Sequence, residues 1–348
     1  MPESTPPPLV PLVVRSGFSL MWGTAPPAEI CRRARALGYP TLALTDTDNL
    51  YGLWPFLSAC EREGIRPIVG AEVTEPGSRR RAVCLVETPA GYANLCRLLT
   101  RRHRRAPFDL EAAVAEFGAG LTVLTGSPAL LRSWRGAGLS VAGAVPRHPI
   151  AAGHPLVRAA REMGVPLAAV PGTFFLESED FAVHRLLRAI AGNTTLSRLA
   201  RQDLAPPEAW LASPGEYARR FHARPEMIRA TRELAERLAF TRPDFGTVMP
   251  PWEDGTGRNA DDALREAAFQ GARKRYGEPL PGAVTGRLEH ELRVIAEKRF
   301  SAYFLVVREI VTRSPRICGR GSGAASLAAY RSEERRVGKE CGSRCSPY

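Results

Sequence analysis

Short apolar runs typical of buried strands alternate with amphipathic helical patterns through the first part of this chain. The strand patterns cover residues 9–14, 41–45, 67–73, 82–87, 121–124 and 166–170. Helical patterns lie between them, among others at 28–37, 53–63, 92–104 and 181–191. Alternation of this kind predicts an α/β fold with a mostly parallel sheet, either open or closed into a barrel.

Beyond about residue 205 the character changes, and helical patterns dominate. They cover residues 215–221, 225–239, 260–276, 283–298 and 303–312. Asn259 is placed to cap one of these helices, with Asp262 three residues further on as in a capping box. A Pro-rich stretch precedes Asn259 and is typical of a linker. We therefore expect a disordered lead-in at 1–8, an α/β domain at 9–240, a linker at 241–258 and the start of a second domain at 259–330.

The last 18 residues, 331–348, follow neither a helical nor an alternating pattern, and they interrupt a helix that begins at 326–330. The segment resembles the translation of a common sequencing-library adapter. It also contains Lys339, one of three lysines in a chain whose other positively charged residues are all arginine. We interpret it as a non-native tail that should be excluded from fold reasoning, and the chain as an N-terminal fragment of a longer protein. The alternative is a natural charged tail.

The chain carries a formal net charge of +12, which favours a nucleic-acid partner. The preference for arginine over lysine is also what a GC-rich genome produces, so the charge supports a DNA partner without establishing it. No apolar run is long enough to span a membrane, and no signal peptide opens the chain. The seven cysteines form no CxxC pair, which indicates a reducing compartment, the cytoplasm.

A glycine-rich turn at 319–323 lies between a short apolar strand pattern and a run of small residues that opens a helix. Free backbone N–H groups at a helix N-terminus, a close-approaching glycine backbone and the guanidinium of Arg320 suit a phosphate group. Ser322 adds a hydroxyl. The simpler alternative is an ordinary turn in which Ser322 caps the helix.

Several ordered motifs resemble one known family. Residues 15–20, 36–39, 42–46, 49–52, 64–72 and 91–95 resemble the polymerase-and-histidinol-phosphatase (PHP) domain of bacterial DNA polymerase III alpha subunits. Tyr276 and residues 287–289, 303–305 and 319–322 continue the match. The resemblance implies a distorted (β/α) barrel, a mostly helical segment and the beginning of a palm similar to the DNA polymerase beta-like nucleotidyltransferases. In such a palm, Gly319, Arg320, Gly321 and Ser322 would hold the triphosphate of the incoming nucleotide.

The PHP half departs from its family at the metal ligands. Active members hold metal ions with a His-x-His pair and further His, Asp and Glu residues; the matching positions here are Val13, Arg15, Thr47, Gly172 and Phe174. Asp46, Glu72 and His184 remain as vestigial ligands, too few to bind metal well, and an arginine in the ring would repel a dication. Structural roles would also explain the survivors: a turn residue, a strand-end carboxylate and a histidine on a helix surface. We expect a scaffold without phosphoesterase activity.

The resemblance implies a DNA-directed DNA polymerase, replicative or error-prone. A primer 3′-hydroxyl would attack a deoxynucleoside triphosphate with the help of two Mg²⁺ ions, and the carboxylates that bind those ions are expected beyond residue 330. Primer-template DNA and deoxynucleoside triphosphates would be its partners, with a sliding clamp and other replisome subunits binding regions outside this chain. The alternatives are a PHP-class metal-dependent phosphoesterase or exonuclease, and a non-catalytic scaffold for DNA or polymerase subunits.

Overall fold

The computed structural model describes residues 9–104, 106–147, 149–244, 246, 248–313, 326 and 328. The chain forms two compact units, Met1–Asp244 and Phe245–Tyr348. The strands of the first unit are β1 (Thr41–Leu44), β2 (Arg66–Thr74), β3 (Arg81–Val86), β4 (Leu121–Thr125), β5 (Ser140–Val145) and β6 (Leu167–Ala169). Its helices are α1 (Pro27–Ala36), α2 (Leu53–Glu63), α3 (Pro89–Arg104), α4 (Leu110–Phe117), α5 (Pro128–Gly136), α6 (Pro155–Glu162), α7 (Phe181–Ala191), α8 (Pro214–Arg220) and α9 (Pro225–Arg237). Three short 3₁₀ helices lie at Ser178–Asp180, Leu196–Arg198 and Arg201–Asp203.

The six strands form one sheet in the order β1-β2-β3-β4-β5-β6. Three neighbouring pairs are parallel, whereas β3 runs antiparallel to both β2 and β4. The reason is local: only a short turn joins β2 to β3, and a parallel pair would need a long crossover. The predicted alternation of strands and helices is confirmed, with this one reversal.

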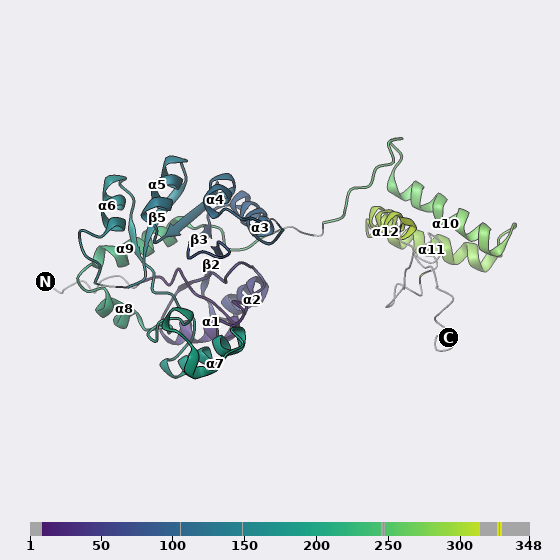
Figure 1. Cartoon of the computed structure of the whole chain (residues 1–348). Coiled ribbons are helices and arrows are strands. Elements are labelled where there is room, and N and C mark those ends of the chain that lie inside the picture. Colours follow the sequence, from purple (N-terminus) through teal and green to yellow (C-terminus); the bar gives the residue numbers. More distant parts are fainter. Residues whose placement is uncertain are drawn as a thin grey trace. The chain divides into compact units, whose positions relative to one another are not determined.

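The segment 11–15 connects the two edges of the sheet. On one side, the Thr45 N–H donates to the Val14 carbonyl at 2.7 Å, next to β1. On the other, the Arg15 N–H donates to the Thr173 carbonyl at 3.0 Å, shortly after β6. The sheet is thereby closed into an irregular barrel with the helices around it (Figure 1), and the predicted distorted barrel is confirmed.

The strand predicted at 9–14 is not a regular strand. Only Val14 forms a ladder bridge, to Thr173. Pro11 has no N–H to donate, and the Val10 N–H donates to the Thr231 hydroxyl of α9 at 3.0 Å instead of to a strand. The segment is therefore extended and buried, but its ladder is interrupted.

Alternate residues of the strands fill the barrel interior. Ala43, Ile68, Val83, Leu85, Leu124, Ala142 and Ala168 form one buried cluster with Leu12, Val13, and Ala230, Leu234 and Leu238 from α9 and the residue after it. The guanidinium of Arg66, the first residue of β2, donates to the carbonyls of Ala235 and Leu238 at 2.8 and 2.9 Å. Helix α9 thus packs at the amino ends of the strands, and the carboxyl ends remain for a cavity.

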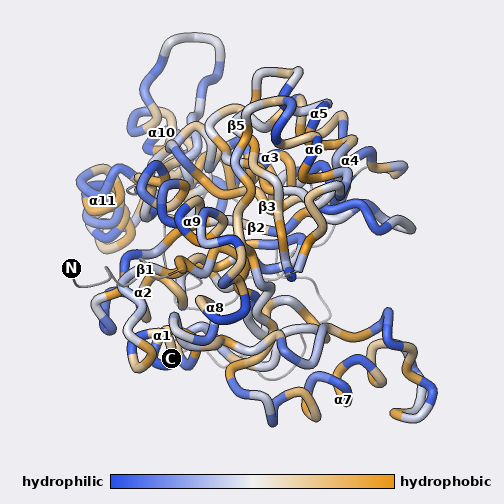
Figure 2. The backbone as a smooth tube through the Cα atoms, turned by 90° about the vertical axis from the view of Figure 1, so that its left-hand side faces the viewer, coloured by the Kyte–Doolittle hydropathy of each residue, from blue (hydrophilic) through white to orange (hydrophobic). Residues whose placement is uncertain are grey.

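The opposite faces of the strands pack against the surrounding helices. Trp134 of α5 is fully buried there, and its indole N–H donates to the Glu111 carbonyl at 3.0 Å. In Figure 2 these helices alternate between orange and blue along their length, as amphipathic helices do. None of the helices in the described ranges has both the length and the apolar character that crossing a bilayer would require.

The second unit contains α10 (Ala260–Tyr276), α11 (Gly282–Glu297) and α12 (Ser301–Arg313). The predicted cap of α10 is confirmed, because Asn259 Oδ1 accepts from the Asp262 N–H at 2.8 Å. Small and aliphatic residues make its core: Ala263, Leu264, Ala268, Ala272, Leu288, Leu292, Ile295, Leu305 and Ala328. Because the buried face of α10 carries small alanine side chains, α10 packs closely against α11 and α12.

Candidate functional site in the barrel

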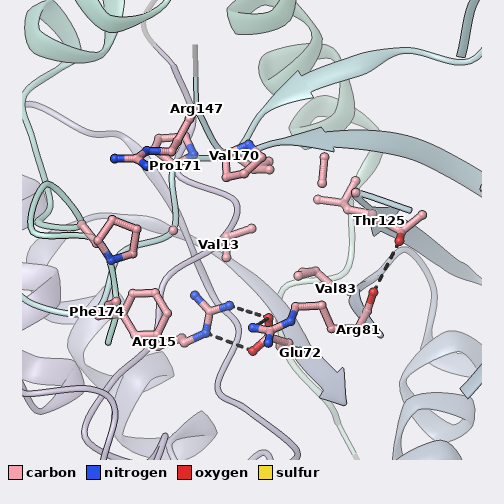
Figure 3. A pocket seen from close by; sticks show the side chains of 18 of the residues that line it. Val13, Arg15, Glu72, Arg81, Val83, Thr125, Arg147, Val170, Pro171 and Phe174 are labelled. Atoms are coloured by element: carbon pink, nitrogen blue, oxygen red, sulfur yellow. Dashed lines mark hydrogen bonds and ion pairs between the residues drawn. The ribbon is translucent and has the colours of Figure 1, made fainter. Parts of the chain in front are cut away.

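A cavity of about 860 Å³ lies at the carboxyl-end mouth of the barrel. Its wall includes Glu72 near the end of β2 and the residues that follow three parallel strands: 125–127 at β4, 146–147 after β5 and 170–172 after β6. Ligand sites of α/β proteins lie at this end of the strands. Four of the positions at which the family carries metal ligands, Val13, Arg15, Gly172 and Phe174, also line the cavity, together with Glu72 (Figure 3).

Arg15 and Glu72 form a buried, bidentate ion pair in this cavity wall. The Arg15 Nε donates to Glu72 Oε2 at 3.2 Å, and Nη2 donates to Oε1 at 2.6 Å. The two side chains are only 5% and 3% exposed. The segment 11–15 and β2 bring them together, because β1 pairs with both. The guanidinium therefore occupies the carboxylate oxygens that a metal would need.

Two further groups contact the Glu72 carboxylate. Arg81 Nη1 lies 3.5 Å from Oε1, and the Thr47 hydroxyl donates to Oε2 at 3.1 Å. Burial by itself raises the pKa of Glu72, but the charge and hydrogen bonds of Arg15, with help from Arg81 and Thr47, lower that pKa below its ordinary value. Glu72 is accordingly a carboxylate neutralised by arginine.

Asp46, two residues after β1, is buried, and its carboxylate accepts several hydrogen bonds. Its carboxylate accepts from the Ser16 N–H at 2.7 Å, the Ser16 hydroxyl at 2.8 Å and the Ser19 hydroxyl at 2.6 Å. Burial raises the pKa of Asp46 in spite of these hydrogen bonds and the nearby Arg15. The Asp46 carbonyl also accepts from the Glu72 N–H at 3.0 Å, so the two surviving carboxylates belong to adjacent segments. Asp46 serves here to hold the 16–19 turn.

His184 lies apart from those two carboxylates. We predicted a helix-surface position as the simpler interpretation, and this was wrong: His184 of α7 is fully buried. The rings of Trp22, Phe174, Phe175 and Phe181 pack around it at centroid distances of 5.8 to 6.1 Å. The surface expectation failed because Trp22, from a distant segment, and Phe174 and Phe175, from the loop before α7, cover this face of the helix.

Both ring nitrogens of His184 are engaged. Nε2 accepts from the Ala205 N–H at 2.9 Å, so Nδ1, 2.8 Å from the Trp22 carbonyl, must carry the proton. Burial lowers the pKa of His184, and the neighbouring Arg188 lowers it further, against the opposing effect of the Trp22 carbonyl. The ring is a neutral bridge between two loops, with no free lone pair for a metal.

The donor set therefore does not fit a metal ion. Within the described parts of the chain, no group of three or more His, Cys, Asp or Glu side chains is placed to hold one. Glu72 is paired with Arg15, Asp46 with two serines, and His184 with two backbone groups. We derive no chemistry through a metal in this cavity.

Sequence reasoning missed most of the cavity's basic residues. Arg79, Arg80, Arg81, Arg147 and Arg220 line it beside Arg15. Arg79, Arg80 and Arg81 lie just before or at the start of β3, and Arg147 follows β5 by two residues. A basic residue next to the start or end of a strand was the available signal, but its use required knowing which strand ends meet in the barrel.

The predicted triphosphate-binding residues, Gly319, Arg320, Gly321 and Ser322, lie outside the described residues, as do the lead-in 1–8 and the tail 331–348. A contact that involves residues shortly after this turn does lie within the described residues. The Glu291 carboxylate of α11 accepts from the Ser326 hydroxyl at 3.0 Å and from the Ala328 N–H at 2.8 Å. This ties the residues after the turn to the helical core of the second unit.

Two family models and several curated polymerases match the sequence of this chain. Residues 11–172 match the family model of the PHP domain, and residues 262–337 match that of the bacterial DNA polymerase III alpha NTPase domain. The error-prone DNA polymerase of Mycobacterium tuberculosis (strain ATCC 25618 / H37Rv) is 33% identical over 92% of this chain and 33% of its own length. The DNA polymerase III subunit alpha of Bacillus subtilis (strain 168) is 29% identical over 92% of this chain and 31% of its own length. A solved amidohydrolase from Chromobacterium violaceum, 17% identical over 48% of this chain and 87% of that one, has a TM-score of 0.38.

The first unit is thus a PHP-type barrel, and the second carries a DNA polymerase III alpha NTPase-domain segment. The chain belongs to the family of bacterial DNA polymerase III alpha subunits and error-prone DNA polymerases. It spans about a third of the length of these two polymerase relatives.

Proposed function

We propose that this chain contributes the PHP barrel and the first palm residues of a DNA-directed DNA polymerase, either replicative or error-prone. One observation carries the proposal: two family models match in order along one chain, and polymerase relatives align over 92% of it. The reaction is attack of a primer 3′-hydroxyl on a deoxynucleoside triphosphate. The partners are primer-template DNA, the nucleotide, a sliding clamp and other replisome subunits, in the cytoplasm.

In this proposal the two units have different tasks. The barrel is a scaffold, because Arg15 neutralises Glu72 where an active PHP site would hold a metal. Gly319, Arg320, Gly321 and Ser322 bind the triphosphate through backbone N–H groups, a guanidinium and a hydroxyl. The contact of Glu291 with residues 326 and 328 supports this role, because it fixes the chain just after the turn. Mg²⁺, bound by carboxylates outside this chain, would stabilise the attacking and leaving oxygens.

A chimaera tests the proposal. Residues 9–330 replace the matching third of the M. tuberculosis error-prone polymerase, and extension of a primed template by the product is measured with Mg²⁺. Template-dependent incorporation is the expected result, with the unaltered relative as the positive control. The present chain through Tyr348 alone should incorporate nothing. A correctly folded chimaera that neither binds primed DNA nor extends it would contradict the proposal.

The PHP phosphoesterase is the less favoured candidate. Its chemistry needs a cluster of metal ligands, and the cavity presents an arginine-neutralised carboxylate instead. Exonuclease activity of the purified chain that disappears in Glu72→Gln or Asp46→Asn would favour this candidate over the scaffold.

A further inference from the structure

One donor of the cavity's central guanidinium has no acceptor. Arg15 uses Nε and Nη2 to hold Glu72, whereas Nη1 is buried and has no hydrogen-bond partner among the described residues. An unsatisfied donor on a buried charged group is costly and uncommon in native proteins. It is expected where a ligand supplies the acceptor.

The position of this donor is well defined. The Arg15 guanidinium stacks over the Phe174 ring, with Cζ 4.3 Å from the ring centroid. Figure 3 shows Nη1 directed away from Glu72, toward the side on which Val13 and Pro171 lie. Gly172 has no side chain there; a β-carbon at Gly172 would lie 3.2 Å from Nη1. The Gly172 backbone therefore packs close to Nη1 and brings no side-chain acceptor to it.

Arginines outnumber glutamates among the side chains that line the cavity. Six arginines line it, but only two glutamates, Glu72 and Glu208. Arg15 and Arg81 share Glu72, and Arg147 pairs with Glu208. Arg80 pairs with Glu75 and Glu111, and Arg220 with Glu216, all three outside the cavity wall. Arg79 donates to Gln202 at 3.0 Å and has no acidic partner within the described ranges. Such a wall attracts anions.

A helix end adds to this potential. Gly126 and Ser127 line the cavity, and Ser127 is the N-cap of α5. The N-terminal end of a helix carries partial positive charge, which favours a nearby anion. The partial positive charge of this helix end adds to the charge of the Arg15 guanidinium in the same cavity wall.

Much of the remaining wall is apolar. Val83, Leu124, Val170, Pro171, Phe174 and Leu204 contribute to it. A volume of about 860 Å³ falls in the range of cavities that enclose a small organic ligand, roughly 300–1,000 Å³. A ligand that fits both parts of the wall has an anionic group and an apolar or aromatic body.

We propose that the barrel cavity binds, without metal, a phosphate ester with an aromatic body of about nucleotide size. A phosphate oxygen accepts from Nη1 of Arg15, and the arginine-rich rim balances the phosphate charge that metal ions balance in active PHP enzymes. The body lies against the apolar wall. The site binds and does not hydrolyse, because the described residues offer no cluster of side chains that would hold a metal to activate water. This inference does not depend on the polymerase proposal.

Calorimetric titration of the purified chain tests it, in buffer with excess chelator so that no metal takes part. The probes are inorganic phosphate, deoxyadenosine monophosphate and deoxyadenosine. The monophosphate should bind more tightly than inorganic phosphate, and deoxyadenosine should bind at least about tenfold more weakly than the monophosphate, because it lacks the charge-assisted contacts. Absence of monophosphate binding in chelator, or equal binding of deoxyadenosine, would overturn the proposal.

Two sets of variants locate the site. Arg147→Ala should weaken monophosphate binding by about threefold or more, whereas its matched control Arg132→Ala should not. Both arginines are half-exposed and paired with one glutamate, but only Arg147 lines the cavity. The variant Arg15→Met/Glu72→Gln removes the orphan donor without leaving a buried charge, and circular dichroism checks its fold. Undiminished binding by this folded double variant would show that the ligand lies elsewhere.

Discussion

Arg15 holds Glu72 through two parallel hydrogen bonds, from Nε at 3.2 Å and from Nη2 at 2.6 Å, inside the mouth of the barrel. The family resemblance predicts that Arg15 stands where metal-binding PHP domains carry a histidine ligand. A cation at this position pairs with Glu72, one of the two remaining carboxylates. The barrel fold is retained, and the Arg15 guanidinium contacts the Glu72 carboxylate where a metal ion would otherwise bind.

The first prediction concerns the energetics of this pair. Arg15→Ala leaves Glu72 buried without its main partner and should lower the free energy of unfolding by about 3–5 kcal/mol, measured by urea denaturation. Arg81→Ala is the matched control, because Arg81 contacts the same carboxylate from an exposed position; its cost should be about 0–1 kcal/mol. Arg15→Met/Glu72→Leu should recover most of the loss. Equal costs for Arg15→Ala and Arg81→Ala would show that the pair is not buried as described.

The second prediction concerns pH. The folded state lowers the pKa of His184, so the folded protein resists the proton that the unfolded chain binds near pH 6.5. The stabilising contribution of neutral His184 is therefore complete above about pH 6.5 and is lost as the pH falls below that value toward the lowered folded pKa. Urea midpoints of the wild type and His184→Gln, compared from pH 8 to pH 5.5, should converge at the acidic end. Parallel curves would rule out the buried neutral ring.

The third prediction concerns the glycine-rich turn and uses the chimaeric polymerase. Arg320→Ala should reduce catalytic efficiency about tenfold to a hundredfold, because a charge-assisted contact to the triphosphate contributes roughly 1.5–3 kcal/mol. Arg320→Lys should recover only part of the loss, since an ammonium lacks the planar fork. Ser322→Ala should have a smaller effect. Near-normal efficiency of Arg320→Ala would mean that the turn is only a helix cap.

A fourth prediction concerns the support of that turn. Glu291→Gln removes the carboxylate that holds Ser326 and Ala328 but keeps an acceptor of similar size. We expect it to raise the KM for the nucleotide in the chimaera more than it lowers kcat. Glu289→Gln is the control, because Glu289 lies on α11 like Glu291 but forms an exposed ion pair with Arg265 of α10. Identical kinetics for the two variants would show that Glu291 does not support the nucleotide-binding turn.

Much of the fold could be predicted from local patterns. The bounds predicted for α2, α7 and α10 agree with the structure, because each is a regular amphipathic helix with clear ends. Strand β5 was missed, since Ser140–Val145 is rich in alanine and glycine and carries little β-strand signal. Its strand structure depends on pairing with β4 and β6, which a local pattern does not contain.

The site was predictable only in part. The family resemblance placed Val13, Arg15, Gly172 and Phe174 in one ring, and all four do line the cavity. The bidentate pairing of Arg15 with Glu72, 57 residues apart, depends on the closure of the barrel. The burial of His184 depends on Trp22 and Phe174, which tertiary packing alone brings to it.

The central claim is that arginine has replaced metal in this barrel, and metal content tests it most directly. The purified chain is dialysed against zinc or manganese, freed of excess ion, and analysed by plasma mass spectrometry beside the triple variant Val13→His/Arg15→His/Thr47→His. We predict well below one ion per chain for the wild type and a gain of bound metal in the triple variant. One or more ions per wild-type chain, lost in Glu72→Gln or Asp46→Asn, would contradict the account.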